Sequence, residues 1–272
     1  IQGHPLAAAR GVHRTWSSNE KTAVEEALGM SFAGKRALVC MKHVGMNVAA
    51  DAFVNSAMTG ANGGLVVVAA DDPSMHSSQN EQDSRFYGKF ALVPTFEPST
   101  QQEAYDMAKA AFELSERFRI PVLMRLTTRM AHSRAVVEVT EPRAENELHA
   151  PADTRRWVLM PGNSRVRYKG LLDDYARLEE AAAASPFNAY AEGPDKRLGI
   201  IACGIAHNYV MENYPDGCPH PVLKLSQYPL PRDLVRRMAS ECQALLVVEE
   251  GQPVVEEAVR GVLPGPCRSG AA

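Results

Sequence analysis

The sequence lacks the cysteine and histidine patterns that build disulfide scaffolds and metal sites. Its five cysteines are odd in number, and no two of them form a C-x-x-C pair. They lie far apart in the chain, at Cys40, Cys203, Cys218, Cys242 and Cys267. The eight histidines give no H-x-x-x-H pair. The spacing argues against a disulfide framework, a zinc site or an iron–sulfur ligand set in this chain, and we expect a cytoplasmic protein.

Long apolar runs and an excess of one charge are also missing. No segment reaches the roughly 20 apolar residues of a membrane-spanning helix, and residues 1–19 do not resemble a signal peptide. The formal net charge is −3, from 29 basic and 32 acidic residues. We therefore expect no membrane and no nucleic-acid partner. With 45% hydrophobic and 22% charged residues, the 272-residue chain is typical of a globular protein with room for two cores.

The motifs that bind phosphates or carry a serine nucleophile are absent as well. The sequence contains no G-x-G-x-x-G, no G-x-x-x-x-G-K-[ST] and no G-x-S-x-G. No Asp and Asn pair with glycine spacing is present to hold a divalent ion on a diphosphate. These absences indicate that the chain supplies only part of an active site, and that any diphosphate and Mg²⁺ are bound elsewhere.

What the sequence does contain is an alternation of β-branched apolar runs with helical patterns. Strands are predicted at 37–41, 65–70 and 121–126, and helices at 19–33 and 101–118. This alternation indicates a parallel sheet with helices on both faces.

The same alternation resumes after a connector that contains one predicted helix, at 170–184. The later strands are predicted at 198–204, 221–225 and 244–250, and the later helices near 206–213, 231–240 and 253–261. We therefore predict an α/β protein with two doubly wound parallel-sheet domains, at 1–140 and 196–272, joined by a connector at 141–195.

Polar residues follow the predicted strands, at the edge where open parallel sheets bind ligands. Residues 42–47, after the first strand, are expected to form a polar loop. Residues 76–85, after the second strand, offer neutral hydrogen-bonding groups, and Arg85 at their end and Lys89 just beyond them could meet a substrate carboxylate. On composition alone, residues 76–85 could equally be a solvated loop.

Glu20 has two interpretations. Ser17 and Glu20 have the spacing of a capping box, in which the glutamate only reaches back to a backbone N–H. Glu20 also shares an apolar helical stripe with Ala23, Val24 and Ala27. It could therefore be a cap, a carboxylate held out of water for chemistry, or both.

Several long stretches stand out for their specificity. In the first half these are WSSNEKTAVEEALGMSFAGKRALV, MKHVGMNVAADAF, ADDPSMHSSQNEQDSRFYGKFALVPTFEPSTQQEAYDM and IPVLMRLTTRMAHS; in the second they are GIIACGIAHNYV, LKLSQYPLPRDLV and LLVVEEGQPVVEEAV. They resemble the α subunits of indolepyruvate ferredoxin oxidoreductases, of the thiamine-diphosphate-dependent 2-oxoacid:acceptor oxidoreductase family. The first half resembles the pyrimidine-binding domain and the second the transketolase-C-like domain.

The resemblance implies a role for Glu20. In that family, a glutamate on the helix before the A-G-A/K-R turn hydrogen-bonds N1′ of the thiamine aminopyrimidine and assists removal of the thiazolium C2 proton. Counting back from Gly34, this glutamate is Glu20. We predict that three residues contact the cofactor: Glu20, His43 and Asn47. We predict that seven contact the substrate: Lys42, His76, Ser77, Ser78, Gln79, Lys89 and Arg129.

The resemblance also implies an activity and partners. The activity is oxidative decarboxylation of an aryl 2-oxoacid to an aryl-acetyl-CoA, with transfer of electrons to ferredoxin. The partners are the 2-oxoacid, CoA, ferredoxin and the remaining domains or β subunit of an oligomer. The family's YPGTPSSEI-like turn, its GDG-like motif for diphosphate and Mg²⁺ and its iron–sulfur cysteines are absent from the 272 residues. We therefore expect a fragment or split subunit that is inactive alone. The alternatives are another 2-oxoacid substrate, such as pyruvate, and a non-catalytic assembly subunit.

Overall fold

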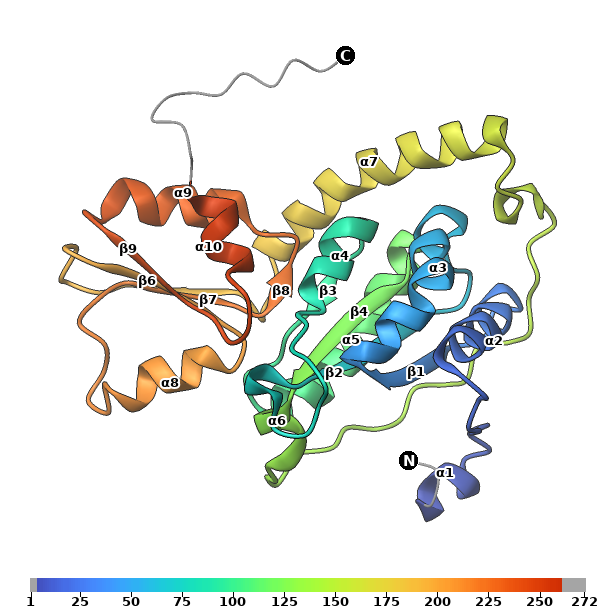
Figure 1. Cartoon of the computed structure of the whole chain (residues 1–272), viewed down its shortest axis with the longest axis horizontal. Helices are drawn as coiled ribbons and strands as arrows, with labels where there is room; N and C mark the ends of the chain where they lie inside the picture. The colour runs from blue at the N-terminus through green and yellow to red at the C-terminus, as the bar shows by residue number, and fades with distance from the viewer. Residues whose placement is uncertain (1–3, 261–272) are drawn as a thin grey trace.

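The computed structural model describes residues 4–260. Two α/β units lie side by side, and a long helix, α7 (Pro161–Ala183), runs along the first unit toward the second (Figure 1). The predicted α/β class with mainly parallel sheets is confirmed.

The first sheet contains the three predicted strands and two short ones. Its order is β1-β2-β4-β3-β8, and its strands are β1 (Ala37–Lys42), β2 (Leu65–Asp71), β4 (Val122–Thr127), β3 (Thr95–Phe96) and β8 (Gln227–Tyr228). The first four are parallel. β8 comes from the second half of the chain and pairs antiparallel with β3. β8 lies within the predicted second domain, 196–272, but is part of the first sheet. The domain boundaries at 140 and 196 stay predictions.

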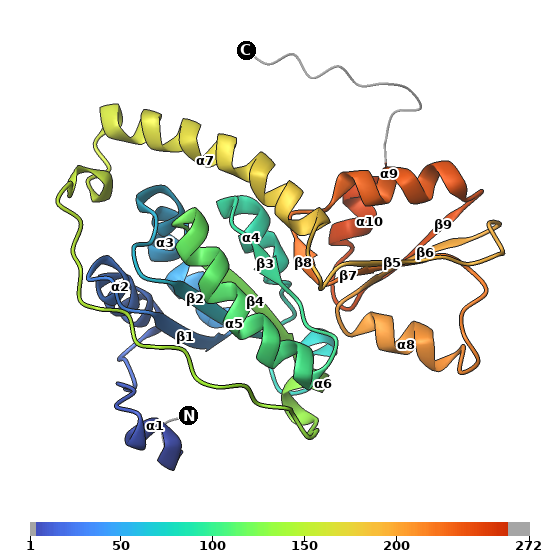
Figure 2. The ribbon, with the colours of Figure 1, turned by 180° about the vertical axis from the view of Figure 1, so that it is seen from behind.

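Helices cover both faces of this sheet because successive side chains of each strand point to opposite sides. Leu65, Val67 and Ala69 of β2 pack with α2 (Glu20–Phe32) and α3 (His43–Thr59), whereas Val66 and Val68 pack under α5 (Gln101–Phe118). Figure 2 shows α5 on the face opposite to α2 and α3. The remaining short helices of this unit are α1 (Pro5–Ala9), η1 (Pro73–Met75), α4 (Arg85–Ala91) and α6 (Thr128–His132).

The expectation of a polar loop at 42–47 is wrong. His43 is the first residue of α3, directly after β1. Met46, Ala49 and Phe53 recur at helical spacing and are buried against the sheet. Burial of this apolar face stabilises a helix here, although polar residues lie between them.

The second sheet has the order β5-β7-β6-β9. Its strands are β5 (Ala189–Ala191), β7 (Val222–Leu225), β6 (Gly199–Cys203) and β9 (Leu245–Val248). All are parallel except β5, a short antiparallel edge strand. The flanking helices are α8 (Ala206–Glu212), α9 (Arg232–Glu241) and α10 (Val254–Val259). Ile201 and Leu223 pack with α9, whereas Ile200 and Val222 pack with Val210 of α8.

The connector contains a longer helix than predicted and a short 3-10 helix before it. Residues 133–154 form no helix or strand, η2 (Arg155–Trp157) follows, and Trp157 stacks on Phe32 at 4.3 Å between ring centroids. The helix predicted at 170–184 starts earlier, at Pro161, because proline is favoured at a first helical position. Within residues 4–260, no helix combines the length and apolar character needed to cross a membrane.

Candidate active site

Glu20 is the first residue of α2, and the predicted capping box is wrong. The N-cap is Asn19, whose side-chain oxygen accepts a hydrogen bond from the Thr22 N–H at 2.9 Å. Ser17 instead donates to Glu26 at 3.3 Å. Asparagine is as strong an N-cap as serine. Because Asn19 is the N-cap, Glu20 occupies the first position of the helix and not the third, where the glutamate of a capping box lies.

The side chain of Glu20 is half-buried against Gly45 of α3. A Cβ at position 45 would lie 2.6 Å from Glu20 Cγ and 2.9 Å from its Oε1, so only glycine leaves the glutamate its place. Within residues 4–260, the carboxylate has no hydrogen-bond or ion-pair partner. Neither carboxylate oxygen is among the buried unpaired polar atoms of these residues, so the group is free to accept a hydrogen bond from a bound molecule.

The contact between Gly45 and Glu20 can be tested by thermodynamics alone. Gly45→Ala should gain helix propensity of up to about 1 kcal/mol, but collision with Glu20 should cancel that gain. In a Glu20→Ala background the collision is gone, so the same substitution should stabilise the protein. The free energies of unfolding of the four proteins, measured in urea, form a double-mutant cycle.

Gly29→Ala is the matched control for this cycle. Gly29 lies in α2, and a Cβ there meets no atom within 4 Å. The substitution should stabilise both backgrounds equally. If Gly45→Ala behaves in the same way as Gly29→Ala, the contact with Glu20 does not constrain position 45.

His43 joins the start of α3 to the loop that follows β2. Its side chain is buried, with Nδ1 3.4 Å from the Ala70 carbonyl oxygen and Nε2 3.1 Å from the Asn80 carbonyl oxygen. Both ring nitrogens therefore face backbone acceptors. The predicted cofactor residue His43 thus has the contacts of a side chain that positions the loop.

The loop at residues 73–80 is organised by the buried carboxylate of Asp72. Its oxygens accept from Thr128 Oγ1 at 2.6 Å, from the Ser77 N–H at 2.9 Å and from the His76 N–H at 3.2 Å. The Thr128 hydroxyl and these backbone donors hold the pKa of Asp72 below its usual range. The loop is thereby tied to the carboxyl ends of β2 and β4.

The predicted substrate residues of this loop are mostly open to solvent. His76, Ser77 and Gln79 are exposed, and Ser78 is half-buried with a buried Oγ that has no partner among the described residues. Arg129, on α6 beside the loop, is exposed and lies over the Tyr209 ring of the second unit, 5.3 Å from its centroid.

The other predicted residues fall into two places. Lys42 and Asn47 are exposed at the start of α3, where Asn47 accepts a hydrogen bond from the Tyr87 hydroxyl. Lys89 lies two residues after Tyr87 on α4 and lines a separate cavity between the two units. The structure therefore places Lys42 directly before, and Asn47 on, the helix that carries His43 and Gly45, and it places Lys89 apart from them.

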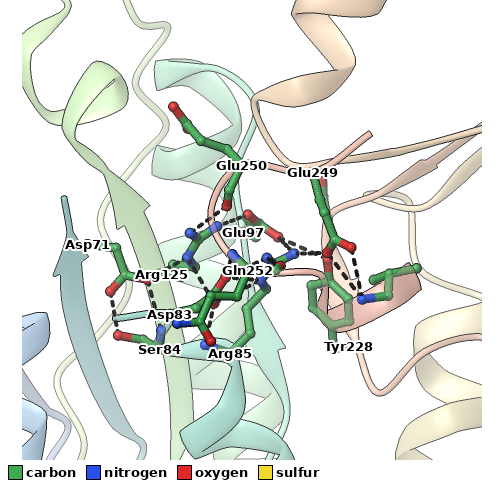
Figure 3. Close-up of polar contacts among 12 residues, drawn as sticks. Asp71, Asp83, Ser84, Arg85, Glu97, Arg125, Tyr228, Glu249, Glu250 and Gln252 are labelled. Atoms are coloured by element: carbon green, nitrogen blue, oxygen red, sulfur yellow. Dashed lines mark hydrogen bonds and ion pairs between the residues drawn. The ribbon is translucent and has the colours of Figure 1, made fainter. Parts of the chain in front are cut away.

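Sequence reasoning missed the main buried polar cluster, an ion network at the junction of the two units (Figure 3). Arg125 of β4 is fully buried and donates from Nε to Asp71 at 2.6 Å, from Nη2 to the Glu250 carbonyl oxygen at 2.7 Å, and from Nη1 to Glu97. Arg85 donates to Asp83 at 2.5 Å and to Glu249 at 2.8 Å. Since Glu249 and Glu250 follow β9, the network bonds the second unit to the first.

The charges in this network are unequal. Two guanidinium groups face the buried carboxyl groups of Asp71, Asp83, Glu97 and Glu249. Burial raises the pKa of Asp71 in spite of the neighbouring Arg125. The pKa of Asp83 is lowered, because Arg125 and Arg85 outweigh its desolvation. The signal in the sequence was a single arginine inside an apolar strand, because such a charge needs buried partners.

Comparison with known proteins places the chain in a family. The family model described as pyruvate flavodoxin/ferredoxin oxidoreductase, thiamine diphosphate-binding, matches residues 7–169, which include Glu20 and the loop after β2. The chain belongs to this family. The resemblance seen in the sequence is thereby confirmed.

The similar proteins of this family include curated subunits of indolepyruvate oxidoreductase. The chain is 46% identical to subunit IorA of Archaeoglobus fulgidus over 255 residues, covering 91% of the chain and 40% of the relative. It is 45% identical to subunit IorA of Pyrococcus abyssi over 267 residues, covering 94% of the chain and 41% of the relative. The chain thus spans about two-fifths of the length of the curated relatives it matches.

Two solved structures share the fold at low sequence identity. A 2-oxoglutarate:ferredoxin oxidoreductase from Magnetococcus marinus, with 2-oxoglutarate, coenzyme A and succinyl-CoA bound, matches with a TM-score of 0.71 at 11% identity, over 93% of this chain and 53% of that chain. A split-gene transketolase, an inactive beta4 tetramer, matches with a TM-score of 0.54 at 16% identity, over 93% and 70%.

Proposed function

We propose that the chain forms the pyrimidine-binding and transketolase-C-like part of an indolepyruvate or other arylpyruvate ferredoxin oxidoreductase. The observation that carries this proposal is Glu20. Its side chain is half-buried, its carboxylate has no partner among residues 4–260, and Gly45 leaves space for it inside the segment that matches the thiamine-diphosphate-binding family. An assembly subunit has no need of such a carboxylate.

The residues around Glu20 fit the aminopyrimidine end of thiamine diphosphate. When bound, that cofactor supplies the nucleophilic carbon for decarboxylation of a 2-oxoacid. Glu20 would share a proton with a ring nitrogen of the bound cofactor, as a general acid–base group does. Gly45 of α3 leaves space for the glutamate side chain, and Asn47, whose Oδ1 accepts from the Tyr87 hydroxyl, offers an amide to a bound ring.

The substrate side of the proposed site is the loop that Asp72 organises. His76, Ser77, Ser78 and Gln79 offer hydrogen bonds there, and Lys42 and Arg129 are exposed cations for a carboxylate. We place Lys89 outside this set, because it lines the cavity between the units.

The remaining parts of the reaction are proposed to lie beyond this chain. Among residues 4–260 no group of His, Cys, Asp and Glu side chains could hold a metal ion. We therefore assign Mg²⁺, the diphosphate and the iron–sulfur clusters to other domains or a β subunit of a cytoplasmic oligomer. CoA and ferredoxin are the other proposed partners.

Steady-state kinetics of the full-length protein with its partner subunits test this function. Indole-3-pyruvate and phenylpyruvate should reduce ferredoxin in a reaction that requires CoA and thiamine diphosphate. Their kcat/KM should exceed that of pyruvate by at least about ten-fold. A preference for pyruvate would favour the alternative substrate class, and the absence of reduction with every 2-oxoacid would favour an assembly subunit.

A further inference from the structure

A cavity of about 500 Å³ lies between the two units, away from Glu20. Its walls come from α4, α7 and the strands β3 and β8 of the first sheet on one side, and from β9, α9 and α10 of the second unit on the other. The lining is mainly apolar and includes Val93, Val235, Leu245 and Val255. Small-molecule sites commonly have this size and character, and they often occur where two domains meet.

The charged groups of the cavity are mostly cationic. Lys89, Arg232 and Arg236 are exposed and line it, and the Lys89 ammonium group has no hydrogen-bond or ion-pair partner among the described residues. Arg232 lies 3.4 Å from Glu179, a carboxylate that also lines the cavity, and Arg236 lies 2.9 Å from Asp233 outside it. The cavity therefore has unneutralised positive charge beside an apolar surface.

Tyr175 of α7 adds a hydrogen-bond donor. Its side chain lines the cavity, and within residues 4–260 its hydroxyl has no hydrogen-bond partner. Burial raises the pKa of this phenol above its usual range, so the hydroxyl stays a donor even in moderately alkaline solution.

We propose that this cavity binds a compact apolar monocarboxylate, with its hydrocarbon body against the valines and its carboxylate toward Lys89. A nucleotide fits the lining poorly, because its phosphates would be buried against aliphatic side chains without a phosphate-binding turn. A neutral hydrocarbon would leave the charge of Lys89 and the Tyr175 hydroxyl unused.

Binding at this site is coupled to the junction of the two units. Arg85 and Tyr228 line the cavity and also take part in the ion network, where the Tyr228 hydroxyl donates to Glu97 at 2.9 Å. A ligand that touches walls from both units favours the docked arrangement. It should therefore raise the thermal midpoint of unfolding with increasing concentration.

The test uses 2-naphthoate as the probe and 2-naphthalenemethanol, of similar size and without charge, as its matched control. Naphthoate should bind the full chain at one saturable site in a fluorescence titration and raise the midpoint of unfolding. The alcohol should bind at least about ten-fold more weakly, because it cannot make charge-assisted hydrogen bonds.

Two variants locate the bound probe. Lys89→Met should weaken naphthoate binding by about ten-fold or more, whereas Lys169→Met, at an exposed lysine of α7 outside the cavity, should leave it unchanged. Ala239→Phe, at an exposed position of the cavity wall, should block binding without lowering the midpoint of unfolding.

Three results would overturn the proposal. The first is no saturable binding of naphthoate to the wild type. The second is binding of the alcohol as tight as that of naphthoate. The third is binding of naphthoate to Lys89→Met and Ala239→Phe with wild-type affinity.

Discussion

Exchange of the thiazolium C2 proton of bound thiamine diphosphate is expected to slow by about 10²–10⁴-fold when Glu20 is replaced by glutamine, as for loss of general acid–base assistance. Glutamine keeps the size of the side chain beside Gly45, but it cannot exchange a proton with a ring nitrogen. Folding stability should change little, because the N-cap is Asn19. The measurement is hydrogen–deuterium exchange at C2 followed by NMR in the assembled protein.

Glu25→Gln is the control for that measurement. Glu25 lies on the exposed side of the same helix, 3.8 Å from Lys21. Glu25→Gln makes the same chemical change as Glu20→Gln, but at a surface ion pair, which contributes little to stability. The C2-proton exchange rate in Glu25→Gln should match that of the wild type. An unchanged rate in Glu20→Gln would remove the main support for a catalytic carboxylate in this chain.

Replacement of Arg125 by methionine should lower the free energy of unfolding by about 3–5 kcal/mol, the usual cost of removing one partner from a buried ion network. Methionine fills part of the volume in β4 but leaves Asp71 without its guanidinium partner and Glu97 with Arg85 alone, at 3.6 Å. Urea unfolding gives the magnitude. Because Arg125 also holds the Glu250 carbonyl, amide hydrogen exchange should accelerate in the loop after β9.

Two further variants show whether the loss comes from unpaired charge. Arg155→Met removes an exposed arginine that pairs with Asp153 at 3.0 Å, and its stability should stay near that of the wild type. Adding Asp71→Asn to Arg125→Met should restore part of the lost stability, since it removes the buried carboxylate that has lost its partner Arg125. A small loss in Arg125→Met, similar to that of Arg155→Met, would contradict a structural role for the network.

The long elements of the fold were predictable because each has a strong local pattern. The runs at 65–70 and 121–126 became β2 and β4, and the helix predicted at 101–118 became α5. The strands β3 and β8 have two residues each, too few to show any alternation. Their positions follow from packing between the two halves of the chain.

The candidate site was predictable only in part. Glu20 could be singled out from its helical stripe and from the family motif. The role of Gly45 could not, because the contact joins two helices across a distance that no local pattern records. The ion network depends on pairs as far apart in sequence as Arg85 and Glu249. Only the unusual arginine within β4 gave a local sign of it.

The glycines after β6 and β9 have a consequence for the independence of the second unit. A Cβ at Gly204 would lie 2.4 Å from Glu97 Cγ, and one at Gly251 would lie 2.8 Å from Arg125 Nη2. The carboxyl ends of these strands are where a doubly wound domain ordinarily receives a small molecule. Here that space is filled by Glu97 and Arg125 of the first unit, so the second unit binds side chains of the same chain where it would otherwise bind a small molecule. Because one chain carries both units, each has a high effective concentration for the other. Two halves produced as separate chains would associate only as their intrinsic affinity allows.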